Sequence, residues 1–247
     1  IHTLVQLLQT STDGWQLPRV TIGDAPRFGY RGVMLDVARH FFSVDVVKAY
    51  IDRASALKFN HLHLHLTDDQ GWRFEVAGHP LLTELGSSTS VGGDPGGFYT
   101  RDDYQELVAY AAKRHMTVVP EIDLPGHTHA VGLAYLHLVA EPALSETVLE
   151  DVRLHGGDIP RAGVAYDGMA VGFSSLHTED SAARTFVADV LRAVAEATPG
   201  PYLHVGGDES LGTDPGEYAD FMAWVTALVT DLGKTPITWH EAGSTDS

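Results

Sequence analysis

Short apolar runs alternate with longer amphipathic stretches along most of this 247-residue chain. That pattern predicts strands alternating with helices. The predicted strands cover residues 33–35, 61–66, 117–123, 202–205 and 236–240, and the predicted helices begin after Ser43, at Thr100, at Ser181 and after Asp214. Strands joined through helices lie parallel and are buried on both faces, so the pattern predicts an α/β fold with a barrel or a doubly wound sheet.

Capping residues mark where several of these helices begin. Ser43 precedes the first helix and is a common N-cap residue. Thr100 is followed three residues later by Asp103, which predicts a capping box. Asp214 is followed by a proline at the first helical position and then by Glu217, which predicts a second box.

The loops after the strands favour a barrel over a doubly wound sheet. A doubly wound nucleotide-binding sheet carries a glycine-rich phosphate loop after its first strand, and this sequence has none there. Two long segments that we expect to be irregular, residues 78–99 and about 124–178, each follow a strand. Loops in that position line the catalytic face of a barrel.

The first 29 residues precede the first strand and do not fit the repeat. Within them, residues 1–10 are predicted to be helical and residues 20–22 to be extended. We interpret residues 1–29 as the end of a preceding small α/β domain or as a barrel cap. Residues 30–247 are then the barrel itself.

Composition narrows the classes of partner. The formal net charge is −17, because 33 acidic residues outnumber 16 basic ones, and such a chain repels nucleic-acid phosphates and anionic membrane surfaces. Neither nucleic acid nor a membrane is expected as a partner. The absence of cysteine excludes disulfides, thiolate metal sites and a cysteine nucleophile. The chain opens on Ile1 without a leader, so we expect any export signal to have been removed.

The stretch HLHLHLTDD places three histidines two residues apart, so that on a strand they share one face. One interpretation is a metal site in which His61, His63 and His65 are joined by later ligands. Those ligands could come from His127, His129, His204, His240 and Asp123. The alternative, which we favour for at least two of the three, is hydrogen-bonded histidines in a buried strand.

Each predicted strand ends in a polar cluster, namely DVARH, TDDQGWR, EIDLPGH, HVGGDE and WHE. Carboxyl ends of parallel strands meet at one face of a barrel. We therefore expect a ring of acids, an arginine and aromatic residues around one pocket, and this ring includes Arg39, Trp72 and Trp239.

The pair Asp208-Glu209 carries the most informative chemistry in this ring. Neighbouring side chains on a strand point to opposite faces, so both carboxylates reach one ligand only where the chain leaves the strand. Gly206-Gly207 permit that departure. Two carboxylates in different environments are what glycoside hydrolysis requires. The alternative is an acidic helix N-terminus stabilised by the helix dipole.

Four stretches together resemble a known family. RGVMLDVARHFF, HLHLHLTDDQGWR, PEIDLPGH and YLHVGGDES occur in this order and are similar to the catalytic barrel of family 20 glycoside hydrolases, the β-N-acetylhexosaminidases, most of all to bacterial members. The likeness runs from about Asp24 to the C-terminus. It implies a TIM (β/α)8-type barrel, of which about the first five β/α units are present.

The resemblance also implies a mechanism and a set of site residues. The substrate's own 2-acetamido group acts as the nucleophile of a retaining reaction. Asp208 matches the residue that orients this group, and Glu209 matches the general acid/base. Arg39 matches the arginine that grips sugar hydroxyls. The remaining matches are Asp68 and His127, which support the acid/base and the pocket floor, and Trp239, which walls the acetamido pocket. Neither a metal nor a cofactor is implied.

A family barrel needs eight strands, and the sequence predicts five, so we expect a fragment of a longer enzyme. The leading function is an exo-acting β-N-acetylhexosaminidase that takes a carbohydrate as its partner and releases terminal GlcNAc or GalNAc. Export is expected from the family's usual substrates. The alternatives are an inactive carbohydrate-binding fragment of such an enzyme and a metal-dependent amidohydrolase.

Overall fold

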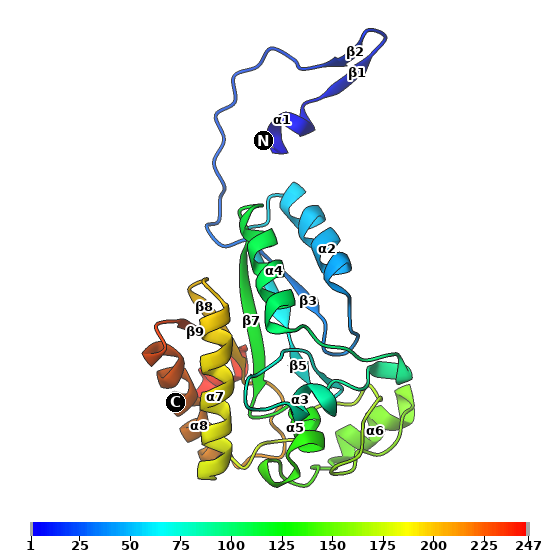
Figure 1. The fold of residues 1–247 in the computed structure, drawn as a ribbon, viewed down its shortest axis with the longest axis vertical. Helices are drawn as coiled ribbons and strands as arrows, with labels where there is room; N and C mark the ends of the chain where they lie inside the picture. Colours follow the sequence, from blue (N-terminus) through cyan, green and yellow to red (C-terminus); the bar gives the residue numbers. More distant parts are fainter. Residues whose placement is uncertain (1, 246–247) are drawn as a thin grey trace.

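The structure, a computed structural model, describes residues 2–245, with helices and strands drawn in Figure 1. The strands are β1 (Gln9–Ser11), β2 (Gly14–Gln16), β3 (Gly32–Asp36), β4 (His61–His65), β5 (Thr67–Asp68), β6 (Gly71–Trp72), β7 (Thr117–Leu124), β8 (Tyr202–Gly206) and β9 (Thr235–Ile237). The α-helices are α1 (His2–Gln6), α2 (Val44–Ala56), α3 (Leu81–Glu84), α4 (Arg101–Ala112), α5 (His129–Ala134), α6 (Glu146–His155), α7 (Ser181–Ala197) and α8 (Pro215–Asp231). The 3-10 helices are η1 (Val91–Gly93), η2 (Leu136–Leu138) and η3 (His240–Thr245).

The central sheet has five strands in the order β3-β4-β7-β8-β9, which is also their order along the chain. Every neighbouring pair in it is parallel, which confirms the predicted α/β class. The first four strands match their predicted bounds within one residue at each end. The fifth was predicted too far towards the C-terminus. Strand β9 ends at Ile237, because the backbone N–H of Ala242 bonds back to the carbonyl of Trp239 and turns the chain into η3.

The helices α2, α4, α7 and α8 follow the strands of the sheet and pack against them (Figure 1). Leu62, Leu64 and Leu66 point towards these helices and are fully buried. They belong to one core together with Val47 and Ile51 of α2. The alternation along β4 therefore turns its histidines to the opposite face of the sheet, as predicted.

The predicted caps are confirmed in part. Thr100 and Asp103 form a complete capping box at α4. Ser43 occupies the N-cap position of α2, but its side chain makes no capping hydrogen bond. Asp214 caps α8 by accepting from two backbone N–H groups. Glu217 does not complete a second box, because its carboxylate accepts a hydrogen bond from Thr178 instead.

The two long insertions were predicted to be irregular, and this was wrong in part. The first contains α3 and η1, and the second contains α5, η2 and α6. Helix α6 begins where the Ser145 hydroxyl accepts from the backbone N–H of Val148. Val148 then packs with Tyr166, Ala170 and Phe173 in a small second core. Both insertions follow the carboxyl ends of sheet strands, so they surround the polar clusters.

The N-terminal segment projects away from the sheet (Figure 1). Its predicted helix over residues 1–10 was too long, since α1 ends at Gln6 and Ile1 lies outside the described residues. Strands β1 and β2 pair instead as a hairpin in which Ser11 faces Gly14, so the turn between them has two residues. Residues 20–22 form no regular strand. The assignment of residues 1–29 to a separate domain or cap stays a prediction.

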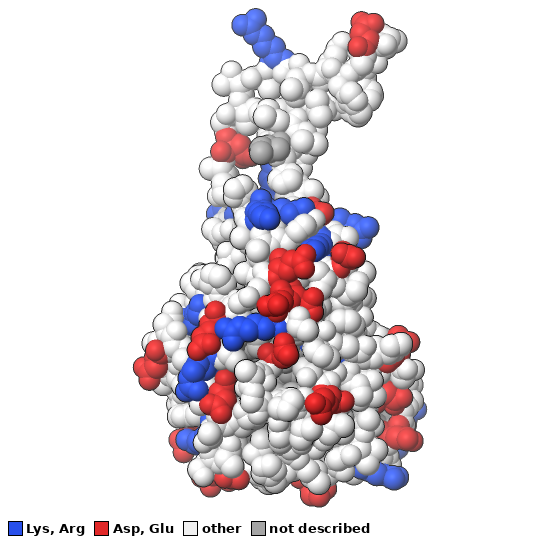
Figure 2. Space-filling view, viewed as in Figure 1, with Lys and Arg blue, Asp and Glu red and all other residues white. Residues whose placement is uncertain are grey.

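Basic side chains lie close to acidic ones on the face shown in Figure 2. Lys48 of α2 pairs with Glu106 of α4, and Arg114 pairs with Asp52. Within residues 2–245, none of the helices has the length and apolar character needed to cross a membrane.

Candidate active site

The register of the sheet aligns four polar residues in one row across its strands. Asp36 pairs with His65, His65 with Glu121, and Glu121 with His204. Paired positions on neighbouring strands project to the same face of a sheet. The row therefore lies opposite the leucine face of β4, near the carboxyl ends of the strands.

Glu121 is the centre of this row, and its carboxylate is fully buried. Its Oε2 accepts hydrogen bonds from His63 Nε2 at 2.8 Å and from His65 Nδ1 at 2.5 Å. Its Oε1 accepts from the indole N–H of Trp239 at 2.8 Å. Burial acts to raise the pKa of Glu121, but the neighbouring histidines, His65 foremost, outweigh burial and hold that pKa well below its usual range. Glu121 is thus an ionised anchor for Trp239.

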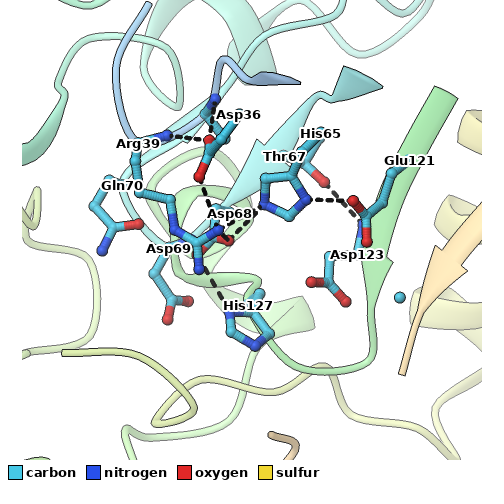
Figure 3. A network of polar contacts seen from close by, with 12 residues as sticks. Asp36, Arg39, His65, Thr67, Asp68, Asp69, Gln70, Glu121, Asp123 and His127 are labelled. Atoms are coloured by element: carbon cyan, nitrogen blue, oxygen red, sulfur yellow. Dashed lines mark hydrogen bonds and ion pairs between the residues drawn. The ribbon is translucent and has the colours of Figure 1, made fainter. Parts of the chain in front are cut away.

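Asp68 connects this row to the other predicted site residues (Figure 3). Its Oδ2 lies 2.8 Å from Nη1 of Arg39 and 2.7 Å from Nε2 of His65. Its Oδ1 lies 3.2 Å from Nδ1 of His127. Burial acts to raise the pKa of Asp68, but the charges of His127 and Arg39 outweigh burial and lower the pKa. Asp68 is therefore a buried carboxylate that orients an arginine and two histidines together.

His65 bridges two carboxylates, with Glu121 at one ring nitrogen and Asp68 at the other. Only a doubly protonated imidazole donates from both nitrogens. Burial acts to lower the pKa of His65, but the Glu121 and Asp68 carboxylates outweigh burial and raise it well above its ordinary value. The positive ring keeps both acids ionised.

Asp208 and Glu209 follow β8 where the chain leaves the sheet, as the sequence predicted. Gly206 and Gly207 have φ angles of 68° and 99°, which favour glycine over any residue with a side chain. This departure turns both carboxylates towards His127, and each has an oxygen 3.7 Å from its Nε2. The Glu209 side chain is 52% exposed and that of Asp208 is 23% exposed, so Glu209 is the more accessible of the two.

Three buried polar atoms near this point have no hydrogen-bond partner within the described part of the chain. They are His127 Nε2, Asp208 Oδ1 and Asp123 Oδ2. Buried polar atoms are rarely left unpaired, so this arrangement suits a ligand that brings its own polar groups. Burial and the charge of Asp208 raise the pKa of Asp123 well above its ordinary value, against the opposing charge of His127.

The two tryptophans predicted for the pocket lie in different places. Trp239 is partly buried, and its ring centre lies 5.6 Å from that of His63 and 5.0 Å from that of His204. Trp72 is only 1% exposed and packs against Phe186 of α7. The prediction that Trp72 faces the pocket was wrong, because the short β5–β6 hairpin turns its indole into the core.

The structure thus connects the predicted site residues through a continuous series of contacts. Arg39 contacts Asp68, Asp68 contacts His127, and His127 lies next to both Asp208 and Glu209. Trp239 joins this series through Glu121 and His65. Sequence reasoning placed Glu121 only within a polar cluster and weighed His65 only as one of three strand histidines, so it assigned neither of them this connecting role. The available signal was a glutamate inside an apolar strand, where a buried charge requires partners.

The histidines of β4 make hydrogen bonds that account for their positions. His63 and His65 both bond to Glu121, which confirms the interpretation of hydrogen-bonded histidines for these two. Two of the proposed metal ligands lie elsewhere, since His129 bonds to the carbonyl of Val164 and the His240 side chain is 91% exposed. Among the described residues, His127, Asp208 and Glu209 form one of four groups whose ligand atoms lie within 4.8 Å of one another. In this group His127 Nε2 and Asp208 Oδ1 have no hydrogen-bond partner.

Known proteins are similar to this chain in both sequence and structure. Residues 28–214 match the model for "Glycosyl hydrolase family 20, catalytic domain". A β-N-acetylhexosaminidase of Cellulomonas fimi is 42% identical over 99% of this chain and 46% of its own length. A solved family 20 β-N-acetylglucosaminidase superposes with a TM-score of 0.91 at 57% identity, covering 100% of this chain and 50% of that one. The β-N-acetylhexosaminidase of Streptomyces coelicolor A3(2) gives a TM-score of 0.87 at 44% identity, covering 99% and 47%. The chain therefore spans about half the length of these relatives, and the predicted barrel class is confirmed.

Proposed function

Because this chain belongs to glycosyl hydrolase family 20, we propose that the protein is an exo-acting β-N-acetylhexosaminidase. Its substrate is a carbohydrate that ends in a β-linked N-acetylhexosamine, either GlcNAc or GalNAc, at the non-reducing end. The observation that carries the proposal is the pair Asp208 and Glu209 beside His127, with buried polar atoms that lack partners. A sugar ring with its acetamido group brings donors and acceptors for such atoms.

The reaction in this proposal retains the anomeric configuration and uses the substrate's acetamido group as its nucleophile. Asp208 accepts a hydrogen bond from the acetamido N–H. The acetamido carbonyl oxygen attacks the anomeric carbon while the glycosidic C–O bond breaks, and Glu209 gives its proton to the leaving oxygen. An oxazolinium intermediate results. Glu209 then takes a proton from water, which attacks the anomeric carbon and restores the acetamido group.

The other site residues bind and position the sugar in this proposal. Nη1 of Arg39 is held by Asp68 at 2.8 Å and by Asp36 at 3.1 Å. A guanidinium held in this way presents its remaining donors to sugar hydroxyls. Asp68 holds His127 beside the reacting carboxylates. The Trp239 indole, fixed by Glu121, provides a flat apolar wall for the acetamido methyl group.

Two substitutions test the assigned roles in the protein expressed from its complete gene. Glu209→Gln removes the transferable proton, so turnover of substrates with poor leaving groups falls by about 10²-fold or more, while sugar affinity is retained. Asp208→Asn weakens the acetamido-assisted step for every leaving group. The measurement is kcat and KM on N-acetylglucosaminides whose leaving groups differ in acidity. Rates unchanged by both substitutions would contradict the mechanism.

A carbohydrate-binding protein without turnover is the second candidate. The observation behind it is that the central sheet of the described residues has five strands, with β3 and β9 at its two edges. Sugar binding measured by calorimetry, with no product released over the same period, would favour this candidate.

A further inference from the structure

Residues 172–176 lie across two loops of the candidate active site, and we call this segment the strap. Gly126 pairs with Ser175 as an antiparallel bridge, so the strap runs along the loop that follows β7. At its other end Gly172 lies against the loop that follows β8, because a Cβ at Gly172 would be 2.8 Å from the carbonyl oxygen of Glu209. None of the site residues predicted from the sequence lies in the strap.

The hydroxyl of Ser174 connects the loop after β7 to Asp69. It donates to Oδ1 of Asp69 and accepts from the backbone N–H of Thr128 at 2.8 Å. The same Asp69 oxygen accepts from the backbone N–H of His129 at 3.0 Å. Ser174 and Asp69 are both buried, so water does not compete for these hydrogen bonds. The two residues that follow His127 are thereby fixed.

Ser175 makes a similar connection to the loop after β8. Its hydroxyl hydrogen-bonds to that of Thr213 at 2.5 Å, and Thr213 in turn bonds to Ser210 at 2.7 Å. Ser210 directly follows Glu209 in the sequence. Two neighbouring serines of the strap therefore connect the loop that carries His127 to the loop that carries Glu209.

The backbones of His127 and Glu209 both require support of this kind. Their φ angles are 54° and 42°, which lie in the left-handed region that residues with a side chain rarely adopt. Among residues 2–245, the two other non-glycine residues with positive φ are Lys58 and His115, in the turns that end α2 and α4. Such a conformation is common after a helix. His127 and Glu209 follow strands instead, and strained residues there persist only where their surroundings hold them.

We propose that Ser174 and Ser175 are positioning residues, which set the distance between His127 and Glu209 and with it the help that Glu209 gives to the departing group. The inference rests on the proposed function, in which Glu209 protonates the leaving oxygen. His127 Nε2 lies 3.7 Å from the Glu209 carboxylate. A change of about 0.5 Å in that distance decides whether the two groups form a hydrogen bond.

His127 has a proton to offer at this position. Burial acts to lower the pKa of His127, but the charges of Asp68 and Asp123 outweigh burial and raise that pKa well above its ordinary value. A doubly protonated ring donates from both nitrogens, so Nδ1 serves Asp68 and Nε2 is left for Glu209. The Glu209 carboxylate that forms when the proton has left is stabilised by this donor. Poor leaving groups depend on that proton, whereas good ones depart without it.

The test measures kcat/KM for two substrates in the protein expressed from its complete gene. They are phenyl N-acetyl-β-D-glucosaminide, whose leaving group needs a proton, and the 2,4-dinitrophenyl glycoside, whose leaving group does not. Ser174→Ala should lower kcat/KM for the phenyl glycoside by about tenfold and for the dinitrophenyl glycoside by less than about twofold. Inhibition by free GlcNAc should stay within about twofold, because the sugar contacts remain.

Two further variants frame this result. Thr213→Val removes the hydrogen bond to Ser175 from outside the strap, at a partly buried position, and should give the same split between the two substrates. It decides the matter if Ser174→Ala does not fold. Ser55→Ala is the matched control, because Ser55 is also a buried serine and its hydroxyl bonds to the Asp52 carbonyl within α2. It should leave the ratio of the two kcat/KM values unchanged.

A second arm separates positioning from a general loss of structure. In a Glu209→Gln protein there is no acid left to position, so the addition of Ser174→Ala should lower kcat/KM for the phenyl glycoside by less than about twofold. An unchanged substrate ratio in a folded Ser174→Ala or Thr213→Val variant, or a further tenfold loss in the Glu209→Gln protein, would overturn the inference. Hydrolysis of the dinitrophenyl glycoside by the parent protein separates these outcomes from a failure of the proposed function. No release from either substrate by the parent protein would overturn both.

Discussion

Replacement of Glu121 by leucine should destabilise the fold severely, because Glu121 is a buried acceptor that several side chains share. Glu121→Leu keeps the approximate size of the side chain but removes both carboxylate oxygens. Three donors then lose their acceptor, namely His63 Nε2, His65 Nδ1 and the Trp239 indole N–H. His65 retains a positive charge that only Asp68 still balances.

The size of this effect can be worked out from the contacts. Removal of one partner from a buried charged pair costs about 3–5 kcal/mol of the free energy of unfolding. Each buried donor left unpaired costs about 1–3 kcal/mol, and such costs overlap within one network. We expect a loss of about 4 kcal/mol, or about 10 °C in the unfolding midpoint for a chain of this size. Glu121→Gln should cost less, because its amide can still bond to Trp239 and to a neutral imidazole.

The assays are urea unfolding and thermal unfolding, each followed by far-ultraviolet circular dichroism, with histidine titration by nuclear magnetic resonance in the same variants. Glu121→Leu should also lower the pKa of His65, since the Glu121 charge is the main influence that raises it against burial. Glu106→Leu is the control, because Glu106 is a surface glutamate that pairs with Lys48 in α2 and lies outside the Glu121 network. Its midpoint should match the parent protein. A Glu121→Leu variant as stable as the Glu106→Leu variant, with an unshifted His65, would refute the reasoning.

Three further outcomes are expected. Arg39→Lys should raise KM about tenfold with a smaller change in kcat, because lysine lacks the forked guanidinium that Asp36 and Asp68 orient. An unchanged KM in steady-state kinetics would contradict this role. In the folded protein the pKa values of Glu121 and Asp68 lie below their ordinary values of 4.5 and 3.8. The stability that the two charged groups contribute is therefore complete above these ordinary values and is lost as the pH falls below them. A thermal unfolding midpoint that stays flat from pH 5 to pH 3 would argue against this contribution. Incubation with a chelator should leave hydrolysis unchanged, since no proposed step uses a metal, and a loss reversed by a divalent cation would favour the metal-dependent amidohydrolase instead.

Much of the fold was predictable because its signals are local. The bounds of α7 follow from an apolar stripe that ends at Thr198-Pro199-Gly200, and α4 begins at its predicted capping box. The hairpin of β1 and β2 was missed although Asp13 in its turn and Gly14 directly after the turn are a turn signal, because the apolar spacing of the preceding residues is typical of a helix. Helix α6 was missed because its single apolar face packs against a distant loop rather than the main core.

The candidate site was predictable where its chemistry depends on neighbours in sequence. The departure of the chain at Gly206-Gly207 could be inferred from glycine alone. The role of Glu121 could not, because it depends on sheet register and on a hydrogen bond to Trp239, 118 residues away. The burial of Trp72 likewise depends on a tertiary contact with α7. Long-range pairing therefore determined which polar residues share the site.

The most direct test of the proposed function is hydrolysis of 4-nitrophenyl N-acetyl-β-D-glucosaminide beside its 2-hydroxy glucoside analogue, with a thiazoline mimic of the oxazolinium intermediate as inhibitor. The protein expressed from its complete gene should release nitrophenol from the acetamido substrate only, and the thiazoline should block that release. Equal release from both substrates, or release that the thiazoline leaves unaffected, would contradict a reaction in which Asp208 directs the substrate's own acetamido group.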